Sequence, residues 1–123
     1  GQEYIKGDIV MYDGGIHTIM DTLGNNYELS YIEHPVHQLE LSGVPITTEI
    51  LDNNRWRKLK SKRYTWWKTR FDGVYYFIKP NKDYPSVWEL CRGNTRRRFE
   101  KIRYIHQLQH FLFGLGLNSE MEV

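Results

Sequence analysis

With 123 residues, of which 40% are hydrophobic, the chain can bury one core but not two, which predicts a single domain over residues 1–123. Its longest apolar stretch, residues 111–117, is far shorter than the roughly 20 residues of a membrane span, and its single cysteine, Cys91, excludes an internal disulfide and multi-cysteine metal sites; we expect a cytoplasmic protein. The net charge of +2 hides an asymmetry, because residues up to Asp52 carry one lysine against nine acids and the remainder carries sixteen Lys or Arg against six acids.

The first part of the chain predicts a small β-meander or barrel over residues 1–45. Strands are predicted over 7–12, 16–22 and 27–32, and turn residues such as Asp13-Gly14-Gly15 separate these runs. A fourth strand is expected near residues 38–41. A short linking helix follows within residues 46–54, over about 48–51, with Thr47 as its N-cap.

The second part predicts an antiparallel sheet over residues 55–100, with strands at 62–70, 74–79, 86–91 and 95–99. Apolar residues then recur at helical spacing between 102 and 115, which predicts a C-terminal helix within residues 101–116. We expect this helix to pack across the second sheet, because its apolar stripe must be buried. The predicted fold class is α+β, mostly β.

The strongest candidate site is the run RWRKLKSKRYTWWKTR at residues 55–70, which contains eight cations and three tryptophans. Side chains alternate along a strand, so one face of 62–70 should mix cations with aromatic rings, and a second basic run could extend it. The candidate residues are Lys62, Tyr64, Trp66, Lys68, Arg70, Arg96 and Arg98. Such a surface suits single-stranded nucleic acid or another polyanion, because bases stack on rings while Lys and Arg contact phosphates.

Two other interpretations of this run stay open. In the first, Trp66 and Trp67 pack in or near the core, and the cations form an ordinary solvated surface. In the second, the acidic part of the chain neutralises the basic part, within one molecule or between copies, which would make the chain an assembly component or a protein-interaction module. Neither interpretation involves a membrane.

Other residues give little indication of catalysis. His106 and His110 have the i, i+4 spacing that lets two histidines share a metal, but we expect both on the polar side of the helix, near Arg103, so no metal is predicted. Cys91 is interpreted as a structural cysteine in a strand. No phosphate loop or nucleophile motif is present, so we predict a non-enzyme that uses no cofactor.

Two stretches resemble a known family. The segment VPITTEIL at residues 44–51, followed by Asn54 and Trp56, and the segment YIHQLQHFLFGL at 104–115 are similar to small uncharacterised proteins of gut anaerobes that are associated with prophages and mobile elements. Those proteins share a PLTxEIL segment and a C-terminal VHxLQxL helix, and the resemblance implies no activity. Residues 6–10, with Gly14-Gly15 and Ile19, resemble the opening of SH3-like barrels, including the KOW type, which implies an SH3-like meander or barrel at the N-terminus.

Overall fold

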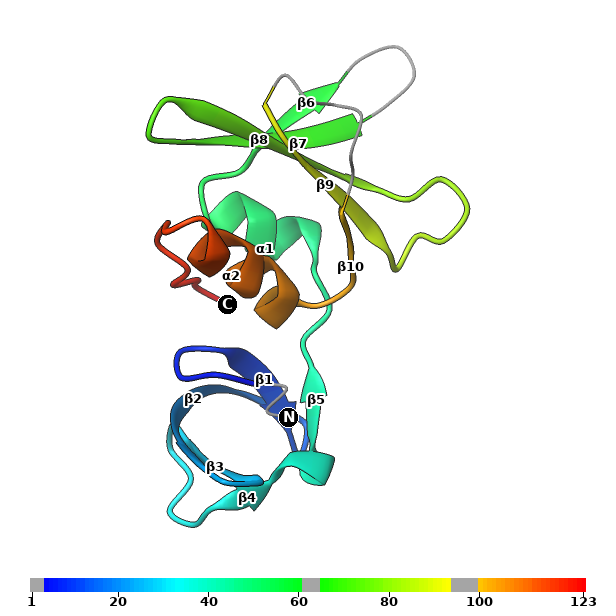
Figure 1. Cartoon of the computed structure of the whole chain (residues 1–123). Helices are drawn as coiled ribbons and strands as arrows, with labels where there is room; N and C mark the ends of the chain where they lie inside the picture. The colour runs from blue at the N-terminus through cyan, green and yellow to red at the C-terminus, as the bar shows by residue number, and fades with distance from the viewer. Residues whose placement is uncertain (1–3, 61–64, 94–99) are drawn as a thin grey trace. The chain divides into compact units, whose positions relative to one another are not determined.

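The computed structural model describes residues 4–60, 65–93 and 100–123, and it divides the chain into two compact units. Residues 1–44 and 104–121 form the first unit, and residues 45–103 and 122–123 form the second. Each unit contains a five-stranded antiparallel sheet and one α-helix within the described residues (Figure 1). The predicted α+β, mostly β class is therefore confirmed. Among the described residues, no helix is long and apolar enough to cross a membrane.

The sheet of the first unit is a meander whose last strand returns to pair with the first. Its strands are β1 (Ile9–Tyr12), β2 (Gly15–Leu23), β3 (Asn26–Leu29), β4 (Val36–His37) and β5 (Leu41–Gly43), in the order β4-β3-β2-β1-β5. Asp13 and Gly14 both have positive φ, which is the conformation of a tight hairpin turn. The register shifts between Ile19 and Asp21, which is an irregularity that bends a strand. Figure 1 shows these strands curling around a common interior.

The prediction of a strand at residues 38–41 is wrong. Gln38–Glu40 form the 3-10 helix η1 between β4 and β5. The reason lies in a capping box, in which the His37 ring accepts a hydrogen bond from the Leu39 N–H and the Glu40 carboxylate accepts one from the His37 N–H. These contacts stabilise a turn instead of an extended conformation.

The core of the first unit lies inside the curled sheet and is almost entirely apolar. Its buried members are Tyr4, Val10, Ile19, Tyr27, Leu29, Val36 and Leu41. Tyr12 and Ile32 pack against them. The alternation of buried and exposed residues along β3 is what the sequence pattern predicts for a strand with one side toward a core.

Helix α2 (Ile105–Gly114) belongs to the first unit, where it packs against β1. The helix was expected across the second sheet, so this part of the prediction is wrong. Gly43 explains part of the packing, because any side chain at this position of β5 would collide with the Tyr104 ring at the start of the helix. The helix ends before Gly116, whose φ of 72° is the usual stop conformation.

The second unit contains α1 (Thr48–Asn53) and a sheet of consecutive hairpins. Its strands are β6 (Arg57–Lys60), β7 (Thr65–Phe71), β8 (Val74–Pro80), β9 (Trp88–Arg92) and β10 (Glu100–Ile102), in the order β10-β9-β8-β7-β6. The predicted cap of α1 is confirmed, because Thr47 Oγ1 accepts a hydrogen bond from the Ile50 N–H at 3.2 Å. Strand β6 was not predicted. The strand expected at 95–99 lies wholly outside the described residues, and β10 begins directly after it.

One face of this second sheet is buried and aromatic. It carries Trp67, Thr69, Tyr76, Ile78, Trp88 and Leu90. The rings of Trp67 and Trp88 meet edge to face, with centroids 5.5 Å apart. Because successive side chains alternate, the neighbours of these residues point to the opposite face of the sheet.

Candidate nucleic-acid interface

Three of the predicted site residues lie together on the outer face of the second sheet. Trp66, Lys68 and Arg70 alternate along β7 with the buried residues Trp67 and Thr69, as the sequence pattern predicts. The remaining candidates, Lys62, Tyr64, Arg96 and Arg98, lie outside the described residues.

Neighbouring strands add further residues to this outer face. Arg57 of β6 and Phe77 of β8 are both opposite Lys68, and Tyr75 of β8 is opposite Arg70. The register follows from the Asp72-Gly73 turn, in which both residues have positive φ, as a two-residue hairpin requires. We call the following set the basic face: Arg57, Trp66, Lys68, Arg70, Tyr75, Phe77 and Lys79.

The aromatic residues of the basic face differ in exposure. Trp66 is half-buried, its ring meets Phe77 edge to face at 6.3 Å, and Lys79 Nζ lies 4.8 Å from its centroid. Tyr75 is 40% exposed and is the most open ring of the set. Sequence reasoning selected Trp66 and missed Tyr75, although the Asp72-Gly73 turn gives the register that places Tyr75 opposite Arg70.

Two cations lie against the Tyr75 ring. Lys68 Nζ is 4.9 Å from the ring centroid, and Arg70 Cζ is 5.4 Å from it. Each cation–π contact at an exposed site contributes about 0.5–1 kcal/mol. The contacts hold two positive groups close together, which costs electrostatic energy that a bound anion would recover.

Among the described residues, most cations of the basic face have no acidic partner. The ion pair of this face is between Lys79 and Glu89, at 3.4 Å, and Glu89 also accepts a hydrogen bond from Asn81. Within the described part of the chain, Arg57, Lys68 and Arg70 form no ion pair. Segments 61–64 and 94–99 add five Lys or Arg and no acid to the composition of this unit.

The charge asymmetry of the sequence follows the two units. The first unit has one lysine and eight acids, and the second has sixteen Lys or Arg and seven acids. Their formal charges are therefore −7 and +9. A local excess of this size creates a positive field around the second unit.

A groove of about 430 Å³ lies at the β6–β7 side of the basic face. Four of the residues that line it are cations, namely Arg55, Arg57, Lys68 and Arg70, and Tyr75 provides an aromatic wall. A volume of this size is within the range of pockets that hold small ligands. The groove therefore combines space, positive charge and one exposed ring.

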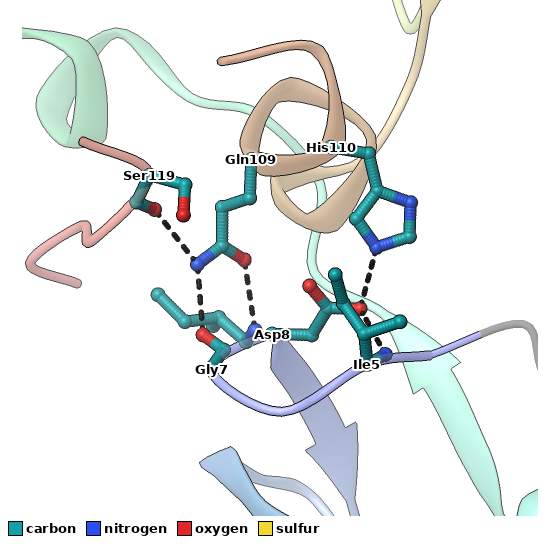
Figure 2. Close-up of polar contacts among 7 residues, drawn as sticks. Ile5, Gly7, Asp8, Gln109, His110 and Ser119 are labelled. Carbon is teal, nitrogen blue, oxygen red and sulfur yellow. Dashed lines mark hydrogen bonds and ion pairs between the residues drawn. The ribbon is translucent and has the colours of Figure 1, made fainter. Parts of the chain in front are cut away.

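The two helical histidines occupy different environments in the first unit. The expectation that both lie on the polar side is wrong for His106, which is 4% exposed and stacks on Tyr104. His110 Nε2 lies 2.7 Å from the carboxylate of Asp8 (Figure 2). The prediction for His106 was wrong because α2 buries residues outside its apolar stripe, including His106 and Gln109.

Burial shifts two pKa values in this cluster. Desolvation raises the pKa of Asp8, and the hydrogen bonds from the Ile5 N–H and from His110 oppose that shift. Desolvation also lowers the pKa of His106, against the attraction of the nearby Asp8. His106 Nδ1 is buried and has no hydrogen-bond partner among the described residues. Burial without a partner costs less for a neutral imidazole than for a charged one.

Neighbouring polar residues have structural roles. Gln109 is 3% exposed; it accepts a hydrogen bond from the Ile9 N–H and donates to the carbonyls of Gly7 and Ser119 (Figure 2). The described residues contain no group of three or more His, Cys, Asp or Glu that could hold a metal ion. Cys91 is 2% exposed, as expected for a structural cysteine.

Comparison of the chain with family models, curated proteins and solved structures gave no match. The geometry and charge of the chain therefore carry the functional argument alone.

Proposed function

We propose that the chain is a non-catalytic binding protein that holds single-stranded nucleic acid on the basic face of its second unit. The observation that carries the proposal is a group of cations, Arg57, Lys68 and Arg70, that form no ion pair among the described residues and lie beside the exposed ring of Tyr75. Cations neutralise phosphates, and an aromatic ring accepts a base by stacking without strong sequence preference. An origin in a phage or mobile element rests on the sequence resemblance and stays a prediction.

Electrostatics supplies the larger share of the proposed affinity. Trp66 is half-buried whereas Tyr75 is exposed, so less of the Trp66 ring is open to a base. Tyr75 is the ring best placed for a base, at about 1–3 kcal/mol per stacked base. Binding should therefore depend steeply on salt and weakly on base sequence.

The test is the affinity of a 12-residue oligothymidylate for the full chain, measured by fluorescence anisotropy at several salt concentrations. Each phosphate contact on a single strand contributes about −0.7 to the slope of log K against log salt, so four contacts predict a slope near −3. Absence of binding at 20 mM salt, or binding that does not change with salt, would contradict the proposal.

A matched pair of variants assigns the binding to the basic face. Lys68→Gln removes a cation of this face, whereas Lys82→Gln removes an exposed cation from the loop after β8. Lys68→Gln should weaken binding several-fold and make the slope less negative by about 0.7, and Lys82→Gln should leave the slope near that of the parent chain. Equal effects of the two substitutions would show that net charge, and not this face, binds the strand.

The opposite charges of the two units favour a second candidate function, which is assembly of copies of the chain. The acidic unit of one copy would attract the basic unit of the next, in a head-to-tail contact that salt weakens. Sedimentation velocity at 20 mM and 500 mM salt tests this function. Oligomers that dissociate at high salt would support it, and a monomer under both conditions would exclude it.

A further inference from the structure

The loop between α1 and β6 places Arg55 beside the groove in an unusual backbone conformation. Its φ is 68°, in the left-handed region where glycine is usual at the end of a helix. The Trp56 N–H reaches back to the Leu51 carbonyl at 3.0 Å, which closes the end of α1 in the manner of a Schellman motif. A glycine at this position would satisfy the same geometry with less strain, so the arginine side chain needs another explanation.

Strand β7 fixes the position of this loop. The Thr69 hydroxyl donates a hydrogen bond to the Arg55 carbonyl at 3.2 Å. Asn54, which precedes it, is engaged by Ile50 and by the backbone of Glu122, so its amide is not free for a ligand. The backbone of Arg55 is therefore held in place, and Arg55 is an exposed residue that lines the groove.

The charge in the groove exceeds what one internal phosphate of a strand can neutralise. Arg55, Arg57, Lys68 and Arg70 bring four positive charges, and they form no ion pair within the described residues. An internal phosphodiester carries one negative charge, whereas a phosphate monoester carries about −1.5 to −2 near pH 7 and offers three acceptor oxygens. Arginine forks match those oxygens well.

We infer that this groove is a binding site for the terminal phosphate monoester of a nucleic-acid strand. The inference rests on the proposed function and deepens it. The monoester contacts Arg55 and the neighbouring cations, the adjacent base lies against Tyr75, and the rest of the strand follows the basic face. The site thus distinguishes a phosphorylated strand end from a hydroxyl end.

The test compares unlabelled oligothymidylates of eight residues as competitors of one labelled strand, with the full chain at a fixed salt concentration. Three competitors differ only in their ends: a 5′-phosphate, a 3′-phosphate, or hydroxyl groups at both ends. We expect one of the phosphorylated strands to compete at least about tenfold better than the hydroxyl-ended strand, since charge-assisted hydrogen bonds to a dianion are added. Equal competition by all three would overturn the inference and leave the proposed function standing, whereas no binding by any strand would overturn both.

Arg55→Gly separates a binding role of Arg55 from a structural one. Glycine accepts the left-handed backbone, so the variant should unfold at the same or a higher temperature than the parent chain. The advantage of the phosphorylated strand should fall to less than about threefold, while the hydroxyl-ended strand loses little affinity. Lys82→Gly, which removes a charge from an exposed loop, is the matched control and should keep the full advantage.

Thymidine monophosphate alone distinguishes a strand end from a free nucleotide. Competition by the mononucleotide that matches the phosphorylated strand would overturn the strand-end assignment, because the basic face would then contribute nothing. Weak competition, with the phosphorylated strand far stronger, supports it. An unchanged preference for the phosphorylated strand in Arg55→Gly would also overturn the inference.

Discussion

Asp8 in the first unit and Lys68 in the second are charged side chains in opposite situations. Asp8 is 2% exposed and accepts hydrogen bonds from the Ile5 N–H and from His110. Lys68 is half-buried, lies against an aromatic ring and forms no ion pair with any acid that the structure describes. The first unit thus uses its buried polar groups to maintain its own fold, whereas the described part of the second unit has cations without an ion-pair partner, as the proposed binding requires.

The largest effect should come from removing Asp8. In Asp8→Ala the partly buried Ile5 N–H and the His110 ring both lose their partner, so the free energy of unfolding should fall by about 2–4 kcal/mol. Urea unfolding followed by far-UV circular dichroism measures this change. Glu33→Ala, at an exposed acid of the same unit, should change it by less than about 0.5 kcal/mol, and a similar loss in both variants would contradict the comparison.

The next effect concerns pH and His106. Because burial lowers the pKa of His106 in the folded chain, protons bind more tightly to the unfolded chain, and stability is lost as the pH falls below about 6.5. The loss approaches about 1.4 kcal/mol per pH unit for a single group. His106→Phe should remove this dependence, while His34→Gln, at an exposed histidine, should retain it.

Asp8 acts on stability in the opposite sense. Its pKa is raised in the folded chain, so the folded state holds this proton more tightly, and stability falls as the pH rises from the unfolded value of 3.8 through the folded one. Comparing the parent chain with His106→Phe between pH 5 and 7.5 isolates the histidine, because Asp8 is present in both. A parallel decline in the two proteins would refute the assignment to His106.

The smallest effect on stability should come from the basic face. Lys68→Gln loses one cation–π contact with Tyr75, so the free energy of unfolding should change by no more than about 1 kcal/mol even though binding weakens several-fold. All four tryptophans lie in the second unit, so tryptophan fluorescence, excited selectively during urea unfolding, reports on this unit alone. A large loss of stability would indicate a structural role for Lys68.

Local patterns were sufficient to predict several parts of this chain. The alternation around residues 66–70 placed Trp66, Lys68 and Arg70 on one face, because side-chain direction along a strand depends on parity alone. The cap at Thr47 was predictable for a similar reason, since it depends on residues within one turn.

Features that depend on contacts distant in sequence could not be predicted. Helix α2 packs on β1 through pairs such as Ile9 and Gln109, which are far apart in the chain and have no local signature. Strand β6 consists of exposed residues and lacks an alternating pattern, so its pairing with β7 left no sequence signal. Predicting the groove would have required the position of Arg55, and the positive φ of this residue is not expected for an arginine.

An NMR titration of the full, isotopically labelled chain with a 5′- or 3′-phosphorylated eight-residue oligothymidylate tests the central claim most directly. The account predicts that backbone amide shifts concentrate on β6, β7 and β8, including Arg57, Lys68 and Tyr75, while Val10 and Ile19 in the core of the first unit stay unchanged. Shifts centred on the first unit, or no shifts at low salt and saturating strand, would contradict it.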